Sequence, residues 1–138
     1  MLRGERVRVV VADDHPSLLE RVVKTLASEF SVVAAVSDGE QAVAKEAELL
    51  PDVMVIDVCM PRMSGLEATA RIRRRGSQVP VVCLTAYPES EMLDAAWEAG
   101  ALGYVAKGSM ASDLVPAVRA ALAGHRFVSA QTPAASPR

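Results

Sequence analysis

The stretch Val53-Met54-Val55-Ile56-Asp57-Val58-Cys59-Met60-Pro61 joins a dense apolar run to one acid and then to a turn. An apolar run without polar alternation is typical of a strand that is buried on both faces, as in a parallel sheet. Ligands of open α/β proteins bind in the crevice outside the carboxyl ends of such strands. Asp57 is therefore expected at a functional edge, although an Asp that only starts a turn has the same local pattern.

The composition limits the kind of protein this can be. A length of 138 residues suits one domain, and a hydrophobic content of 51% is enough for a core. The net charge of −2 is not typical of a nucleic-acid binder. The two cysteines, Cys59 and Cys83, lie in or beside apolar runs, which fits a reducing compartment better than a disulfide framework.

Membrane and export signals are also missing from the sequence. No apolar run approaches the roughly 20 residues that span a bilayer. Residues 1–6 lack the apolar core of a signal peptide. We therefore expect a cytoplasmic protein with no membrane contact.

Strand patterns and helix patterns alternate five times along the chain. Short β-branched or apolar runs predict the strands, and apolar residues at helical spacing predict a helix after each of them. The predicted strands are residues 7–12, 31–36, 53–57, 80–84 with Thr85 at the end, and 101–106 with Lys107 closing it.

Local signals predict where the second and third helices begin. Asp38 with Gln41, and Ser64 with Glu67, form capping-box patterns. The second helix must stop before Pro51, because the residue before a proline is disfavoured in the helical conformation. Glycines predict the ends of the last three helices; these are Gly76, Gly100 and Gly124.

Prolines bear on the starts of the last two helices. Pro88 is the candidate first residue of the fourth helix. Ser109 or Ser112 is expected to cap the fifth helix. Pro116 would then lie in its first turn, where a missing N–H costs least.

The alternation predicts an α/β fold: a doubly wound, five-stranded parallel sheet with helices on both faces and right-handed crossovers. For five strands the flavodoxin-like order 2-1-3-4-5 is expected. One domain should cover residues 1–129, with residues 126–129 packed back on its body. Residues 130–138 hold small residues and two prolines, which predicts a disordered tail or the start of a linker.

Polar residues stand at the ends of four of the five predicted strands. Asp13 and Asp14 follow the first, Asp57 ends the third, Thr85 ends the fourth and Lys107 closes the fifth. In a parallel sheet these ends open on one edge. Two carboxylates ~4 Å apart repel by roughly 4 kcal/mol at an effective dielectric near 20. Three of them need more compensation than one Lys supplies.

The type of ligand indicates the missing cation and the chemistry. Carboxylate oxygens without a His or Cys cluster favour Mg²⁺. His15 has two interpretations, a residue near the rim of the site or a surface residue, and the second is favoured for a lone His beside a proline. An Asp, a Mg²⁺, a Lys and a hydroxyl are the groups that transfer of a phosphoryl group requires. Asp57, at the centre of the edge, is the candidate nucleophile, because carboxylates form aspartyl phosphates. Lys107 and Thr85 would hold the phosphoryl oxygens.

These residues, in this order, resemble the receiver domain of two-component response regulators. The resemblance covers about residues 5–128. It rests on the acid pair 13–14, on residues 57–61 with Gly65, on Thr85-Ala86 and on Lys107. His15-Pro16, residues 65–68 and residues 103–107 are most similar to the NarL/FixJ-type, LuxR-like branch of that family.

The resemblance implies a role for each matching acid. Asp57 would accept a phosphoryl group from a phosphohistidine on a sensor histidine kinase or a phosphotransfer protein. Asp14, Asp57 and the backbone carbonyl of Cys59 would bind Mg²⁺ directly, and Asp13 would act largely through water. Such a domain would catalyse only its own phosphorylation and dephosphorylation.

The resemblance also implies a switch. Tyr104 matches an aromatic residue that turns inward as Thr85 moves toward the phosphate, which changes the face of the fourth helix, fifth strand and fifth helix. Cys59 and Tyr87 match two positions that shape water access and hence the phosphate lifetime. Gly108 stands where the family often has a proline in a cis bond, so the isomer of that bond is left open.

Partners follow from the same resemblance. The kinase or phosphotransfer protein would dock along the first helix, near Leu18 and Leu19, and a homodimer would form through the fourth or fifth helix. Regulators of this branch usually continue into a helix-turn-helix DNA-binding domain, which residues 130–138 do not contain. The basic run at 71–75 is interpreted as a solvated face, so no nucleic-acid contact by this chain itself is expected. The chain is thus the regulatory domain of a transcriptional regulator or a stand-alone receiver.

Three other functions fit the sequence less well. A Mg²⁺-dependent aspartyl-phosphate phosphatase of the haloacid-dehalogenase type would need its nucleophile after the first strand and a cap for the substrate, and no insertion is long enough for a cap. A flavin site is disfavoured because Asp13 and Asp14 would repel the flavin phosphate. A degenerate receiver that acts only as an interaction module is disfavoured by the complete set of site residues.

Overall fold

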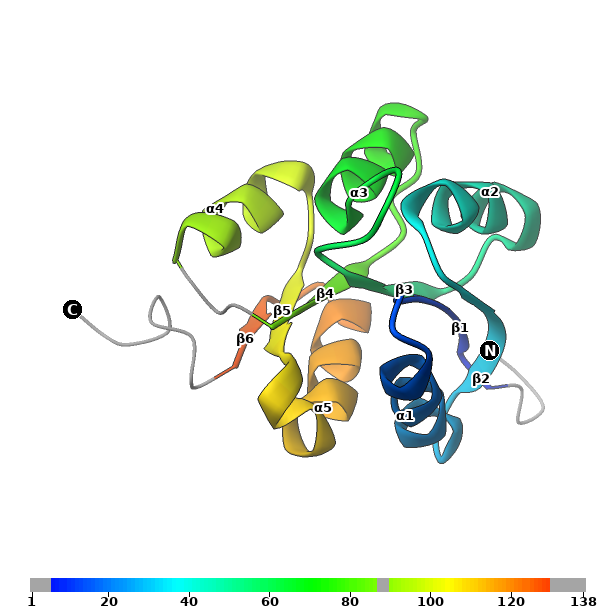
Figure 1. Cartoon of the computed structure of the whole chain (residues 1–138), viewed down its shortest axis with the longest axis vertical. Coiled ribbons are helices and arrows are strands. Elements are labelled where there is room, and N and C mark those ends of the chain that lie inside the picture. Colours follow the sequence, from blue (N-terminus) through cyan, green and yellow to red (C-terminus); the bar gives the residue numbers. More distant parts are fainter. Residues whose placement is uncertain (1–5, 87–89, 130–138) are drawn as a thin grey trace.

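The computed structural model describes residues 6–86 and 90–129, and it contains one parallel sheet between two layers of helices. The helices α2, α3 and α4 cover one face of the sheet, and α1 and α5 cover the other (Figure 1). The strands are β1 (Arg8–Ala12), β2 (Ser31–Val36), β3 (Val53–Asp57), β4 (Val81–Thr85), β5 (Gly103–Ala106) and β6 (Phe127–Val128). The helices are α1 (Pro16–Ala27), α2 (Gly39–Leu49), α3 (Gly65–Arg74), α4 (Ser90–Ala99) and α5 (Met110–Leu122), with a 3₁₀ turn η1 (Lys107–Ser109).

The order of the strands is β2-β1-β3-β4-β5-β6, and every neighbouring pair is parallel. The predicted order 2-1-3-4-5 and the helices on both faces are therefore confirmed. The sheet has six strands rather than five, because the residues expected to pack back on the body form β6 beside β5. In that pair Phe127 lies opposite Gly103 and Val128 opposite Tyr104.

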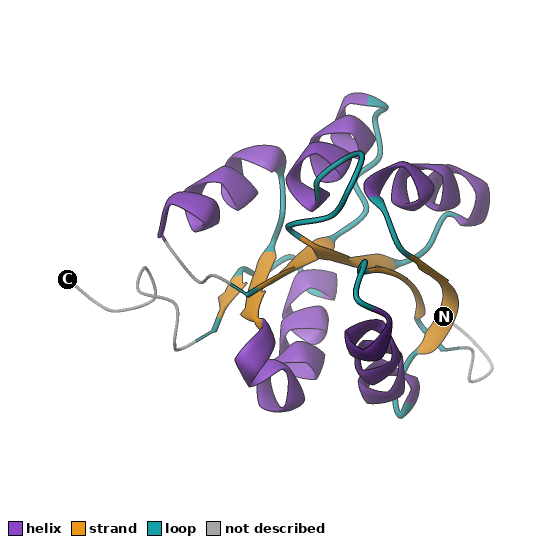
Figure 2. Ribbon diagram, in the orientation of Figure 1, coloured by secondary structure: helices purple, strands orange, loops and turns teal. Residues whose placement is uncertain are grey.

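The central strand β3 shows why its sequence lacks polar alternation. All five of its residues are buried, and its side chains contribute to both cores of the molecule. Met54 and Ile56 belong to the core under α2, α3 and α4, whereas Val53 and Val55 belong to the core under α1 and α5. Figure 2 shows β3 in the middle of the sheet between these two helical layers.

Two predicted caps form as expected. The Asp38 carboxylate accepts a hydrogen bond from the Gln41 backbone N–H (2.8 Å), and the Ser64 hydroxyl accepts one from the Glu67 N–H (3.1 Å). Gly76, Gly100 and Gly124, the three glycines expected at helix ends, all have positive φ, which is the conformation that favours glycine after a helix.

Some predicted boundaries were wrong. The fifth strand begins at Gly103 and not at Ala101, because the N–H of Ala101 donates to the Ala96 carbonyl (2.9 Å) and so finishes α4. The first and fourth strands each begin one residue later than expected. The expected start of α4 at Pro88 lies outside the described residues, as does the expected tail at 130–138.

The start of α5 agrees with Ser109, one of the two predicted caps, but the expected place of Pro116 was wrong. The helix begins at Met110, so Pro116 lies inside it and not in its first turn. The buried side chains of Met110 and Leu114 pack into the core under α1 and α5, which extends the helix upstream of Ser112. Ser109 holds the N-cap position, but its side chain makes no capping hydrogen bond. In the part of the chain that is described, no helix combines the length and apolar character that crossing a membrane requires.

Two glycines let the loop after β3 pack against the sheet. A Cβ atom at Gly65 would collide with the carbonyl oxygen of Asp57, and one at Gly39 would collide with the carbonyl oxygen of Met63. The N–H of Gly65 also donates to the carbonyl of Val58 (2.9 Å). The backbone that follows Asp57 is thus held in place by a contact that allows no side chain.

We predict that Gly65→Ala lowers the free energy of unfolding by about 2 kcal/mol or more, because the added methyl group meets backbone that cannot move away. Gly108→Ala is the matched control, since a Cβ there meets nothing within 4 Å. Urea unfolding of both variants checks the prediction. Equal stability of Gly65→Ala and the parent protein would contradict it.

Candidate functional site

The register of the sheet brings the predicted polar residues to one edge. Ala12 of β1 pairs with Ile56 of β3, so Asp13 and Asp57 follow at the same level. Thr85 pairs with Ala106, the residue before Lys107. The Lys107 ammonium lies 2.9 Å from Asp57 Oδ2 and 3.6 Å from Asp13 Oδ2. The strand ends therefore meet as the sequence predicts.

A cavity of about 460 Å³ opens over this edge. Its lining includes the predicted residues Asp14, Asp57, Cys59, Thr85 and Lys107, and it also includes the side chain of His15. Asp13 is fully buried beneath the cavity. A small molecule or a reactive group of a partner can thus reach Asp57 from one side.

The surroundings of the Asp57 carboxyl group disfavour its ionised form. Only 2% of the residue is exposed. Burial raises the pKa of Asp57, the hydrogen bond from Lys107 acts against this rise, and the nearby charge of Asp13 adds to it. The net direction is upward, which makes Asp57 a more basic carboxylate than one in water.

The carboxylate oxygens of the site are only partly satisfied. Asp13 Oδ1 accepts a hydrogen bond from the His15 N–H (2.9 Å), and Asp57 Oδ1 accepts one from the Cys59 N–H (3.2 Å). Asp13 Oδ2 and Asp14 Oδ1 are buried and accept no hydrogen bond from the described residues. Because buried polar atoms normally have partners, these two oxygens fit a site for a hard divalent cation.

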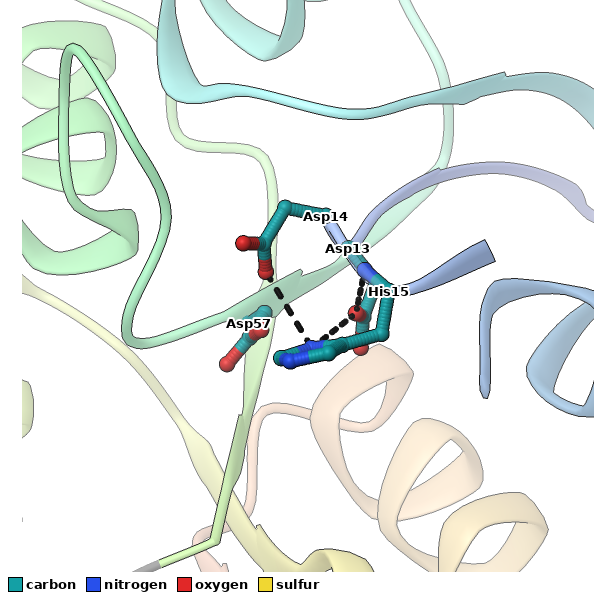
Figure 3. Close-up of side chains that lie close together, drawn as sticks. All are labelled: Asp13, Asp14, His15 and Asp57. Atoms are coloured by element: carbon teal, nitrogen blue, oxygen red, sulfur yellow. Dashed lines mark hydrogen bonds and ion pairs between the residues drawn. The ribbon is translucent and has the colours of Figure 1, made fainter. Parts of the chain in front are cut away.

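His15 is where the sequence interpretation was incomplete. Its side chain is 64% exposed, as expected for a surface residue, but its Nδ1 atom lies 3.3 Å from Asp14 Oδ1 and 3.5 Å from Asp13 Oδ1. Figure 3 shows the imidazole beside the carboxylates of Asp13, Asp14 and Asp57. Ligand atoms of these four residues lie within 4.8 Å of one another. The position of His15 directly after the acid pair was the signal that could have indicated this contact.

The remaining predicted residues lie around the cluster. Tyr104 is fully buried, on the sheet face covered by α3 and α4, opposite Cys83 of β4. Cys59 has an exposed thiol, whereas burial raises the pKa of the Cys83 thiol to about 12, which keeps it protonated. Tyr87 lies outside the described residues. The Lys107–Gly108 peptide bond is trans, like every other peptide bond of the described residues.

Residues 9–119 match the response regulator receiver domain family. The response regulator GacA of Pseudomonas viridiflava is 37% identical over 127 residues, which are 91% of this chain and 59% of the relative. The transcriptional regulatory protein LiaR of Bacillus subtilis is 35% identical over 120 residues, which are 86% of this chain and 57% of the relative. The chain thus spans about three fifths of the length of these relatives.

Solved structures that are similar to this chain include response regulators, as do the sequence relatives. A LuxR-family response regulator from Aurantimonas sp. superposes with a TM-score of 0.86 at 33% identity, over 94% of this chain and 92% of that one. The receiver domain of NarL from Mycobacterium tuberculosis gives 0.84 at 35% identity, over 88% of this chain and 100% of that one. The chain therefore belongs to the response regulator receiver domain family, beside structures of the LuxR and NarL type.

Proposed function

We propose that Asp57 accepts a phosphoryl group from a phosphohistidine of a sensor histidine kinase or phosphotransfer protein, in a reaction that requires Mg²⁺. The observation that carries the proposal is the placement of Asp57. Its buried carboxylate faces an open cavity, with the Lys107 ammonium 2.9 Å away and two unsatisfied carboxylate oxygens nearby. This is an arrangement for holding both a cation and an anionic group.

The proposed metal ligands are those that the resemblance to receiver domains implies, and the acid cluster of Asp13, Asp14 and Asp57 supports a cation at this place. Asp14, Asp57 and the backbone carbonyl of Cys59 would hold Mg²⁺, with Asp13 acting through water. The ion supplies positive charge that offsets the charge of the phosphoryl oxygens. The protein residues contribute geometry and the remaining charge.

In the transfer step an oxygen of the Asp57 carboxylate forms a bond to phosphorus while the bond from phosphorus to the histidine nitrogen breaks. The imidazole leaves with the electron pair of that bond. Asp57 needs no general base, because its carboxylate is the nucleophile. Lys107 moves its interaction from Asp57 Oδ2 to a phosphoryl oxygen, and the Thr85 hydroxyl donates to another.

The proposed switch links the site to the face of α4, β5 and α5. Thr85 pairs with Ala106, two residues after Tyr104. A displacement of Thr85 toward the phosphoryl group would therefore act on β5 directly. Since the Tyr104 ring is already buried in this structure, phosphorylation would stabilise an inward position that the unmodified chain can adopt, which is a shift of populations.

The output is proposed from the relatives. GacA and LiaR are regulators longer than this chain, and a relative from Mycolicibacterium smegmatis, 38% identical over 117 residues, is named as the DNA-binding response regulator MtrA. The chain would act as the regulatory domain of a transcriptional regulator, with pairing through α4 or α5 as the step that phosphorylation promotes.

We predict that incubation with Mg²⁺ and acetyl phosphate adds the mass of one phosphoryl group to the protein, because Asp57 is reachable from the cavity. Intact mass spectrometry measures the gain. Asp57→Asn should show no gain, and neither should the parent protein in the presence of EDTA. Lys107→Ala should slow modification about 100-fold or more, because a donor to the phosphoryl group is lost.

A gain of equal mass in Asp57→Asn would place the acceptor elsewhere and contradict the proposal. So would unchanged modification without divalent cations. Asp94→Asn, on the exposed face of α4, is the matched control and should be modified like the parent.

We also predict that Asp57→Asn raises the melting temperature at pH 7 by about 2–5 °C, as expected for removing roughly 1 kcal/mol of charge burial. Because the native pKa of Asp57 is raised, the folded state binds this proton more tightly than the unfolded chain. Stability is therefore lost as pH rises from the ordinary carboxyl pKa through the raised one. The increase in melting temperature of Asp57→Asn over the parent should therefore be largest at a pH above the raised pKa. It should vanish at a pH below the ordinary carboxyl pKa.

Thermal unfolding from pH 3 to pH 8, without divalent cations, checks this second prediction. Asp94→Asn serves again as the control, and its difference from the parent should stay near zero at each pH. A lower melting temperature of Asp57→Asn at pH 7 would mean that the ion pair with Lys107 outweighs the cost of burying the charge.

A further inference from the structure

The His15 side chain has no part in the phosphoryl transfer described above, yet it lies against the acid cluster. Its Nδ1 atom is 3.3 Å from Asp14 Oδ1 and 3.5 Å from Asp13 Oδ1. Ligand atoms that share one ion at right angles, with bonds of about 2.0–2.1 Å, lie about 3 Å apart. The separations around His15 are therefore close to those of neighbouring ligands.

The backbone of His15 is fixed on both sides. Its N–H donates to Asp13 Oδ1 (2.9 Å), and Pro16, the first residue of α1, restricts the residue before it to extended conformations. His15 accordingly has φ −98° and ψ 111°. Its side chain makes no helix-capping hydrogen bond. The constrained backbone keeps the Cα of His15 beside the cluster, and the Nδ1 contacts with Asp13 and Asp14 show that the imidazole turns toward it.

The oxygens beside His15 can accept a cation, since in the described part of the chain only the Lys107 ammonium, 3.6 Å from Asp13 Oδ2, offsets the charge of that oxygen. Asp13 is fully buried, and its Oδ2 atom accepts no hydrogen bond from the described residues; the same is true of the buried Oδ1 atom of Asp14. With Asp57 these residues form a group of three carboxylates and one imidazole. The exposed Cys59 thiol is not among the ligand atoms of that group.

We propose that His15 is a metal ligand through Nδ1 and that it gives this site a preference for first-row transition-metal dications over Mg²⁺. Carboxylates alone suit Mg²⁺ and Mn²⁺, whereas an imidazole nitrogen favours ions such as Fe²⁺ and Ni²⁺, and affinity rises from Mn²⁺ through Fe²⁺ to Ni²⁺. The inference rests on the proposed binding of a divalent cation by Asp14 and Asp57, and it adds a nitrogen to their oxygens.

The test uses Mn²⁺ and Ni²⁺ as probes, with Mg²⁺ as the reference. Pulsed electron paramagnetic resonance of Mn²⁺ bound to the whole chain should show coupling to an imidazole nitrogen, and His15→Ala should abolish it. By titration calorimetry, His15→Ala should weaken Ni²⁺ binding by about tenfold or more, as expected when a ligand is lost. Mg²⁺ binding should change by less than about twofold.

Two further variants make the test specific. His125→Ala removes the second of the chain's two histidines, which is exposed after α5, and it should leave both the nitrogen coupling and the Ni²⁺ affinity unchanged. His15→Asn keeps a residue that favours the N-cap position but lacks the imidazole. It should behave like His15→Ala, and a melting curve shows that it is folded.

The outcomes separate this inference from the proposed function. If Mn²⁺ binds in an Asp57-dependent way without nitrogen coupling, the ligand role of His15 is overturned while the phosphoacceptor site stands. If His15→Ala strengthens Mg²⁺ binding, His15 is a competing countercharge, which also overturns the inference. If no divalent ion binds the parent protein, the proposed function fails together with it.

Discussion

The structure depends on how one edge of the sheet tolerates three carboxylates beside a single ammonium group. Lys107 contacts Asp57 and Asp13 at 2.9 Å and 3.6 Å, and two buried carboxylate oxygens still lack hydrogen bonds. Buried charges that are incompletely paired cost folding free energy. Burial of the Asp57 carboxylate raises its pKa for the same physical reason. A divalent cation would offset this excess negative charge. A phosphoryl group adds negative charge of its own, so its binding at this edge would depend on that cation and on Lys107.

The rest of the sheet keeps these charges from moving apart. Strand β3 is buried over its whole length, and the close approach of Gly65 to the Asp57 carbonyl fixes the backbone directly after the acid. His15 is held in the same way by Pro16 on one side and by its hydrogen bond to Asp13 on the other. Rigid backbone thus maintains the separation of the charges, so the side chains meet a ligand without a costly rearrangement.

The last described residues connect this edge to the neighbouring elements β5 and α5. The Ser129 N–H donates to the Tyr104 carbonyl (3.0 Å), and the Ser129 hydroxyl donates to the Asp113 carboxylate of α5 (2.8 Å). The same hydroxyl accepts a hydrogen bond from the N–H of Ala106, which directly precedes Lys107. The guanidinium of Arg126 lies 4.5 Å from the centre of the Trp97 ring on α4. The residues of β6 and those flanking it therefore contact α4, β5 and α5. These are the three elements whose conformation we propose to change on phosphorylation.

The sequence by itself determined the five alternating units, the strand order, and the residues Asp13, Asp14, Asp57, Thr85 and Lys107, because buried parallel strands and strand-end positions leave strong local patterns. Tertiary structure decided three other features. The two residues of β6 became a strand only because β5 offered an unpaired edge. Of the two predicted caps of α5, Ser109 rather than Ser112 holds the N-cap position, because burial of Met110 and Leu114 favoured the longer helix. The group of Asp13, Asp14, His15 and Asp57 exists only because the fold brings β1 and β3 side by side, since no local pattern gives a distance between residues 42 positions apart along the chain.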